Sequence, residues 1–110
     1  MDPKLLAGTV DLLLLEVIGH QPSYGYQIVQ TVFERSRNSL DLKEGSLYPA
    51  LHRLERQKAL VSYWTEAEGR RRKYYKLTAA GRKLLADKRD EWTEFAGGIN
   101  GVLGVQLGML

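Results

Sequence analysis

The sequence predicts a mainly α fold with a small β-hairpin, an α+β domain organised around one core. Apolar residues recur at helical spacing in three segments before residue 59 and in one segment after residue 78. Between them, β-branched and aromatic residues flank a glycine-bearing loop, which indicates two short strands. With 110 residues, 44% of them hydrophobic, the chain suits a single modest core.

The first helix is expected over residues 5–19 and ends at Gly19. Its apolar side chains repeat every three or four residues, so we expect a largely buried helix carrying Leu6, Val10, Leu13, Leu14, Val17 and Ile18. Asp11 and Glu16 interrupt the apolar run, which is too short to span a bilayer. The sequence therefore predicts a cytoplasmic chain with no membrane contact.

Two more helices precede the hairpin. Ser23 is expected to cap the second helix, whose core face carries Gly25, Ile28, Val29 and Val32. The polar segment RSRNSLDLK is expected to connect it to a third helix from Glu44 to Lys58. Because proline lacks an amide donor, Pro49 is tolerated only near the beginning of that helix.

The hairpin and the last helix complete the domain. LVSYWT and RRRKYYKL are expected to be strands joined through EAEG. Tyr74 and Tyr75 are interpreted as cross-strand packing residues. Thr78 is expected to cap the last helix, which carries Leu84, Leu85, Trp92, Phe95 and Ile99 as apolar surface.

Positive charge is concentrated in the middle of the chain. Residues 43–76 hold nine basic and four acidic residues, a net charge of +5, whereas the remaining seven basic and nine acidic residues give −2. This distribution is typical of a localised contact with a polyanion. A solvated charged face is the alternative for any such cluster taken alone.

Three helices followed by a basic ribbon are the plan of a winged helix-turn-helix, in which the third helix enters the major groove of DNA. Leu47, Ala50, Leu51 and Leu54 would anchor this helix to the core. The residues predicted to read DNA are Ser46, Tyr48, Pro49, His52, Arg53 and Arg56. Those predicted to contact phosphates are Lys43, Arg70, Arg71, Arg72 and Lys73.

Two of these residues have a structural alternative. The ring of Tyr48 lies near the edge of the apolar face, so it could belong to the core. Arg53 could pair with Glu44 or Glu55, but an exposed pair contributes less than about 1 kcal/mol and would leave Arg53 available.

Three motifs together resemble the PadR family of bacterial transcriptional regulators. They are SYGYQI at 23–28, EGSLYPALHRLE at 44–55 and GRRRKYYKLTAAG at 69–81, and the resemblance covers Leu5 to Trp92. It implies a homodimer that binds a pseudo-palindromic operator, usually as a repressor, and releases it when a small molecule binds. It also implies a DNA-binding domain over residues 1–77 and a dimerisation helix with a glycine-rich tail over 78–110.

Only about 30 residues follow the hairpin, fewer than in the longer members of the family. In some short, multidrug-responsive relatives a tryptophan of the last helix lines a cavity between subunits. The resemblance thus makes Trp92 a candidate for contact with an aromatic or drug-like effector, and ordinary interface packing is the alternative. The residues predicted for the dimer interface or effector site are Leu85, Trp92, Phe95 and Ile99.

Glycines recur at 97, 101, 104 and 108 and would form one stripe if the last helix continued. A close helix contact and a frayed terminus are both compatible with that pattern.

Other function classes have little support in the sequence. The chain has no cysteine, no catalytic motif and no glycine-rich phosphate loop, so we expect neither an enzyme nor a cofactor. His20 and His52 are far apart, which argues against a metal site. A winged-helix module that binds protein instead of DNA remains the alternative, although the RRRK run at 70–73 disfavours it.

Overall fold

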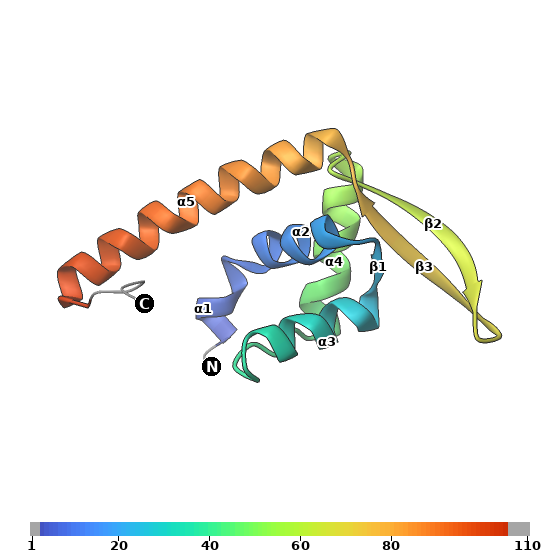
Figure 1. Ribbon diagram of the computed structural model, residues 1–110, viewed down its shortest axis with the longest axis horizontal. Helices are drawn as coiled ribbons and strands as arrows, with labels where there is room; N and C mark the ends of the chain where they lie inside the picture. The colour runs from blue at the N-terminus through green and yellow to red at the C-terminus, as the bar shows by residue number, and fades with distance from the viewer. Residues whose placement is uncertain (1–2, 106–110) are drawn as a thin grey trace.

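The computed structural model describes residues 3–105, and its helices and strands follow the predicted order (Figure 1). Five helices and three strands form over this range: α1 (Pro3–Ala7), α2 (Val10–His20), β1 (Ser23–Tyr24), α3 (Gly25–Arg35), α4 (Glu44–Arg56), β2 (Leu60–Ala67), β3 (Arg70–Leu77) and α5 (Ala79–Leu103). The expected fold class, a winged helix-turn-helix with a long C-terminal helix, is confirmed.

The expected first helix is divided in two. Gly8 and Thr9 form a turn between α1 and α2, in which both the amide and the hydroxyl of Thr9 donate to the carbonyl of Leu6, each at 2.9 Å. α2 continues one residue beyond Gly19, to His20. The prediction was correct in its apolar periodicity but missed this turn.

The hairpin belongs to a three-stranded antiparallel sheet of order β1-β3-β2, so the predicted two-stranded ribbon gains a short third strand. Ser23 is therefore not the N-cap of the second helix, because it pairs with Tyr75 in the sheet. Its buried hydroxyl donates to the carbonyl of Gln21 at 2.9 Å. The helix begins two residues later, at Gly25.

The core lies between α2, α3, α4 and the base of the sheet. Its fully buried side chains come from all four: Leu14, Leu15 and Ile18 of α2, Ile28 of α3, Leu47, Leu51 and Leu54 of α4, and Leu60 and Tyr75 of the sheet. Burial of so many large apolar side chains is the main stabilising contribution. It fixes α4 and the sheet relative to each other.

A tight turn joins β2 to β3. The strands pair from Leu60–Leu77 to Ala67–Arg70, which leaves Glu68 and Gly69 as the loop. Both loop residues have positive φ, 56° and 75°, as a type I′ hairpin turn requires. The twist of this turn matches that of the strands, so the hairpin projects as a wing.

α5 is fixed at its beginning. The amide of Gly81 donates to the hydroxyl of Thr78 at 2.9 Å, which confirms Thr78 as the cap. A Cβ at Gly81 would lie 2.1 Å from the carbonyl oxygen of Ala59, so only glycine allows this approach to the segment between α4 and β2. Further along, Arg89 donates to Glu16 of α2 at 2.7 Å.

Beyond α2, the second half of α5 extends away from the domain (Figure 1). The helix is continuous to Leu103, where Gly104 adopts φ 74° and Val105 donates to the carbonyl of Asn100 at 2.9 Å. Gly97 and Gly101 are thus helical, whereas Gly108 lies outside the described residues. Over residues 3–105, no helix is both long enough and apolar enough to cross a membrane.

Candidate nucleic-acid interface

α4 separates its buried and exposed residues cleanly. Its four predicted anchors, Leu47, Ala50, Leu51 and Leu54, are all buried. Ser46, Pro49, His52 and Arg56 are exposed. Pro49, expected near the beginning of the helix, lies inside it, in the second turn. The exposed side offers hydroxyl, imidazole and guanidinium donors from one rigid helix.

Arg53 lies on the flank of α4 that faces α2. Its Nη2 donates to Oδ1 of Asp11, so its partner is neither Glu44 nor Glu55. Glu55, on the other flank, accepts from the hydroxyl of Ser62 and lies 3.8 Å from Nζ of Lys73. The two flanks of α4 are thereby connected to different elements, one to α2 and one to the wing.

Tyr48 is partly packed and partly exposed. A Cβ at Gly25 would lie 2.4 Å from its hydroxyl oxygen, so the end of the ring rests directly against the start of α3. The side chain nevertheless remains 38% exposed. Tyr48 therefore joins α4 to α3 and also presents ring surface to solvent, which combines the two interpretations offered by the sequence.

The cations of the wing lie over aromatic rings. The guanidinium carbons of Arg71 and Arg72 are 4.9 and 4.5 Å from the ring centroids of Trp64 and Tyr24. Nζ of Lys73 is 5.5 Å from the centroid of Tyr75. Such contacts restrict long side chains while leaving their charge available to a polyanion. Two other predicted phosphate contacts, Arg70 near the tip and Lys43 beside Asp41, are exposed.

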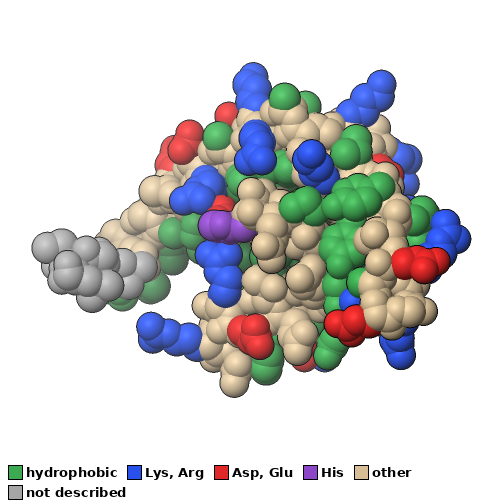
Figure 2. Space-filling model, turned by 45° about the vertical axis from the view of Figure 1, so that its right-hand side comes forward, with side chains coloured by type: hydrophobic (Ala, Val, Ile, Leu, Met, Phe, Trp, Pro, Cys, Tyr) green, Lys and Arg blue, Asp and Glu red, His purple; other side chains and the backbone are tan. Residues whose placement is uncertain are grey.

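Tyr74 packs across the sheet, as predicted, stacked on Tyr63 and edge-on to Tyr24. The ring of Tyr74 lies 5.8 Å from that of Tyr63 and 5.3 Å from that of Tyr24, between centroids. On the other face Tyr75 is buried, and burial, with the nearby Glu55 carboxylate adding to it, raises the pKa of its hydroxyl above 10.0. Figure 2 shows Lys and Arg side chains around a hydrophobic patch on the hairpin side of the molecule.

A cavity of about 350 Å³ separates α4 from the wing. Its lining is aromatic and cationic: Tyr24, Gly25, Tyr26, Tyr48, His52, Trp64, Arg72, Lys73 and Tyr75. Tyr24, Tyr26 and Trp64 were not predicted as interface residues. Tyr24 and Tyr26 lie in the SYGYQI motif, which contributed to the family resemblance but gave no site assignment, and Trp64 lies in the predicted strand LVSYWT. The cavity brings Tyr48 and His52 of α4 together with Arg72 and Lys73 of the wing, whereas Lys43 and Ser46 line a separate cavity beside α1 and α2.

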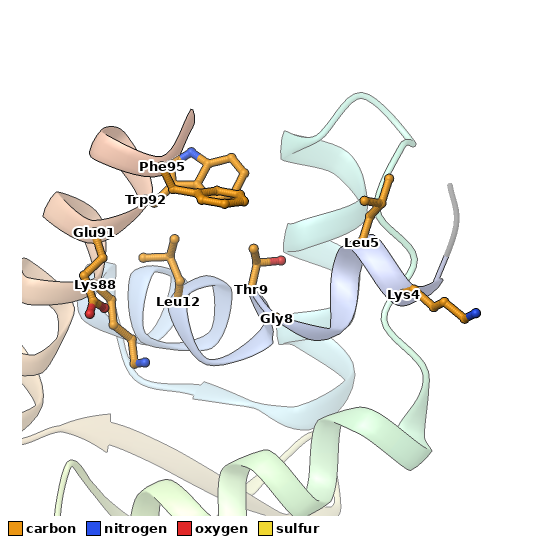
Figure 3. Close-up of a pocket in the computed structure, with 9 residues that line it drawn as sticks. All are labelled: Lys4, Leu5, Gly8, Thr9, Leu12, Lys88, Glu91, Trp92 and Phe95. Carbon is orange, nitrogen blue, oxygen red and sulfur yellow. The ribbon is translucent and has the colours of Figure 1, made fainter. Parts of the chain in front are cut away.

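A second cavity, of about 440 Å³, lies between α1, α2 and α5 (Figure 3). Its lining residues are Lys4, Leu5, Gly8, Thr9, Leu12, Lys88, Glu91, Trp92 and Phe95. The rings of Trp92 and Phe95, with centroids 6.1 Å apart, lie opposite Leu12 and Thr9.

The four residues predicted for the interface or effector site divide into two groups. Leu85 is half-buried and packs against the core of the domain, close to Gly19. Trp92, Phe95 and Ile99 are exposed, and a groove of about 480 Å³ runs past Phe95 and Ile99 towards Leu103.

Metal-ligating side chains do not gather in the part of the chain that the structure describes, where no three His, Cys, Asp or Glu residues converge. His20 instead pairs with Glu16 at 3.0 Å, one turn earlier on α2.

Comparison with known proteins identifies the family. Residues 14–87 match the family described as "Transcriptional regulator PadR-like family". The chain belongs to the PadR-like family. The match spans α2 to the first part of α5 and therefore includes α4 and the wing. It places the chain among transcriptional regulators and not among enzymes.

Individual relatives agree with this PadR-like assignment. A transcriptional regulator of Mycobacterium tuberculosis is 43% identical over 63 residues, which cover 57% of this chain and 59% of the relative. The structure of a transcriptional regulator from Clostridium thermocellum has a TM-score of 0.82 at 34% identity, over 89% of this chain and 96% of its own. The structure of a PadR family transcription regulator from Clostridium difficile has a TM-score of 0.75 at 37% identity, over 87% of this chain and 99% of its own.

Proposed function

We propose that this PadR-like protein is a sequence-specific DNA-binding repressor that acts as a homodimer on a pseudo-palindromic operator. The observation that carries the proposal is the combination of α4, anchored by buried leucines and polar on its exposed side, with an adjacent cationic wing. α4 would lie in the major groove, and the wing would follow the backbone. Because bacterial DNA lies in the cytoplasm, we also propose that the protein is cytoplasmic.

Base reading is assigned to α4, through Ser46, Tyr48, Pro49, His52, Arg53 and Arg56. An arginine that donates two hydrogen bonds to guanine discriminates against a wrong base by about 1–3 kcal/mol. Lys43 and the wing cations Arg70 to Lys73 contribute charge that attracts any sequence. The Tyr26 and Trp64 side chains, between these two groups, extend the same surface.

Dimerisation is assigned to α5. Trp92, Phe95 and Ile99 are exposed on one side of this helix, and Val102 and Leu103 extend the same side. A contiguous apolar stripe on an isolated helix is characteristic of a surface that another chain covers. With α5 of each subunit paired, the two α4 helices could enter successive major grooves about one helical turn apart.

The cavity beneath Trp92 and Phe95 is the proposed effector site. Its aromatic rings and the aliphatic side of Leu12 suit a flat, drug-like aromatic compound. Because the cavity adjoins the proposed dimer surface, a bound compound would alter the separation of the two α4 helices. A coupling of about 1–3 kcal/mol between ligand and DNA is sufficient for regulation.

DNA binding is tested with a site selected from a randomised duplex library by the purified protein. Anisotropy titrations then compare that site with a scrambled duplex of equal composition across a salt series. We expect two chains per selected duplex, a clear preference over the scrambled one and a steep loss of affinity with salt. Equal affinity for both duplexes would reject sequence reading, and absence of binding at low salt would favour a protein-binding module.

The effector site is tested by the fluorescence of Trp92 in a Trp64→Phe background, which leaves one tryptophan. A panel of flat aromatic compounds is first screened for release of the selected duplex. A releasing compound is expected to change the Trp92 emission. If every releasing compound leaves the emission unchanged, Trp92 is interface packing and the effector binds elsewhere.

A further inference from the structure

Arg53 has a partner that its own helix does not supply. Asp11 belongs to α2, 42 positions earlier in the chain, and its Oδ1 accepts from Nη2 of Arg53. The carboxylate is 23% exposed and the guanidinium side chain 44% exposed. This contact is therefore neither a solvated surface pair nor a buried one, and part of the Arg53 side chain remains open to solvent.

We propose that Asp11 is a positioning residue that holds Arg53 in place to read a base of the operator. The inference rests on the proposed function, because it assigns a role within sequence-specific DNA binding. Asp11 itself contacts no DNA in this proposal. It acts through the orientation of the guanidinium, whose planar fork must align with the edge of a base.

Both ends of the contact are fixed by the core. Next to Asp11, Val10 is buried, and Leu14 and Leu15 follow in the same helix. Leu54, adjacent to Arg53, is completely buried. Since the two backbones cannot move apart without disturbing the core, the carboxylate defines one position for the guanidinium. Asp11 also lies in the first turn of α2, where the helix dipole favours a negative charge.

The geometry leaves Arg53 able to bind a base. A guanidinium has five N–H donors, and the contact with Asp11 uses one of its terminal nitrogens. The remaining donors can form the two parallel hydrogen bonds that recognise guanine. A free arginine would lose rotamer freedom when it binds, whereas one already held by a carboxylate loses less.

Asp11 also reduces binding to the wrong DNA. A carboxylate next to Arg53 offsets part of its positive charge, and charge alone attracts every phosphate backbone equally. Hydrogen bonds to a base edge depend on direction, so they are retained only where the correct base is present. Asp11 is therefore expected to raise the ratio of specific to non-specific affinity.

The test compares Asp11→Asn, Arg53→Ala and the double variant on the selected duplex and on its scrambled counterpart. Arg53→Ala should lose about tenfold in affinity for the selected duplex, as expected for one lost base contact. Asp11→Asn should lose about fivefold on the same duplex, with equal or slightly tighter binding to the scrambled one. The double variant should lose no more than Arg53→Ala alone, because Asp11 acts only through Arg53.

Glu16→Gln provides a matched control. It removes one negative charge from the same helix, but Glu16 pairs with His20 and Arg89 and not with α4. This variant should keep the wild-type ratio of affinities for the two duplexes. Thermal unfolding of each variant distinguishes a folding defect from a defect in base recognition. Asp11→Glu should restore part of the preference for the selected duplex over the scrambled one.

Base-pair substitution gives the most specific readout. Asp11→Asn and Arg53→Ala should both relax discrimination at the same base pair of each half-site. The positioning role is rejected if Asp11→Asn keeps the wild-type ratio of affinities for the two duplexes. It is also rejected if the affinity lost in Asp11→Asn adds to that lost in Arg53→Ala. If the wild-type protein itself makes no distinction between the two duplexes, the proposed function fails and this inference fails with it.

Discussion

α4 and α5 are both amphipathic helices, but only α4 completes its apolar side within the subunit. The four apolar anchors of α4 are 0–3% exposed. In the second half of α5, the apolar side chains are 46–89% exposed: Trp92, Phe95, Ile99, Val102 and Leu103. The same helical periodicity therefore produces a buried apolar side in α4 and an exposed apolar side in α5.

Under the proposed function, this difference gives the two helices different roles. Because α4 is held by the core of its own subunit, its other side can present polar groups in a fixed arrangement, as base reading requires. α5 leaves the core after its first turns, and its exposed apolar side is the surface that we propose a second chain covers. Substitutions in α4 anchors should therefore affect the fold, and those in the stripe of α5 should affect association.

Leu51→Ala is expected to have the largest effect on stability. Leu51 is completely buried, so its removal leaves a cavity in the core and should lower the free energy of unfolding by about 2–5 kcal/mol. Urea denaturation followed by circular dichroism measures this loss. Leu103→Ala, in the exposed stripe of α5, is the comparison, and an equal loss there would remove the distinction between the two helices.

Phe95→Asp should separate the subunits while leaving each one folded. Phe95 is 62% exposed, and a charge at the centre of an apolar interface should weaken association by at least about 2 kcal/mol, or roughly 30-fold. Sedimentation velocity over a concentration series gives the dissociation constant. Thr93→Asp adds the same charge to another side of the helix and should leave the dimer intact. Equal dissociation in both variants would mean that the stripe is not the interface.

Alanine substitutions at two glycines of α5 should have opposite signs. At Gly81 the new methyl group would meet the carbonyl of Ala59, which should cost about 1–3 kcal/mol. At Gly97 nothing lies within 4 Å, and the helix should gain about 0.5–1 kcal/mol. Thermal unfolding of the two variants measures both changes in stability. A dimer weakened by Gly97→Ala would instead indicate that the glycines contact the partner chain.

Local patterns were sufficient to predict α4, the hairpin and the Thr78 cap. Each depends on residues within a few positions of one another, such as the leucines of α4 or the hydroxyl and amide at the start of α5. The resemblance of the EGSLYPALHRLE segment to the PadR family pointed to the same helix, and the family is now established. The roles of single residues in DNA binding remain proposals.

Features that depend on distant residues could not be predicted. Ser23 was interpreted as a helix cap because its local sequence allows one, yet a strand partner at Tyr75 determines its conformation. Arg53 was compared with acids in its own helix, whereas the carboxylate that it contacts is Asp11 of α2. Gly8 could have indicated the turn between α1 and α2, but apolar periodicity continues across it and outweighed that signal.

The smallest predicted effect concerns pH. Burial raises the pKa of the Tyr75 hydroxyl above 10.0, so the folded state prefers the protonated form more strongly than the unfolded state does. The stability from this group is complete below pH 10 and is lost as pH rises towards the pKa of the folded state. Urea unfolding between pH 8 and 11 should show a smaller loss in Tyr75→Phe than in wild type, whereas Tyr63→Phe should behave like wild type.

Hydroxyl-radical footprinting of the selected duplex tests the central claim, that two α4 helices read one DNA site. Two chains joined through α5 should protect two segments with centres about one helical turn, or roughly 34 Å, apart. Phe95→Asp should remove this paired protection at concentrations where wild type retains it. A single protected segment in the wild-type complex, or a paired footprint that Phe95→Asp leaves unchanged, would contradict the account.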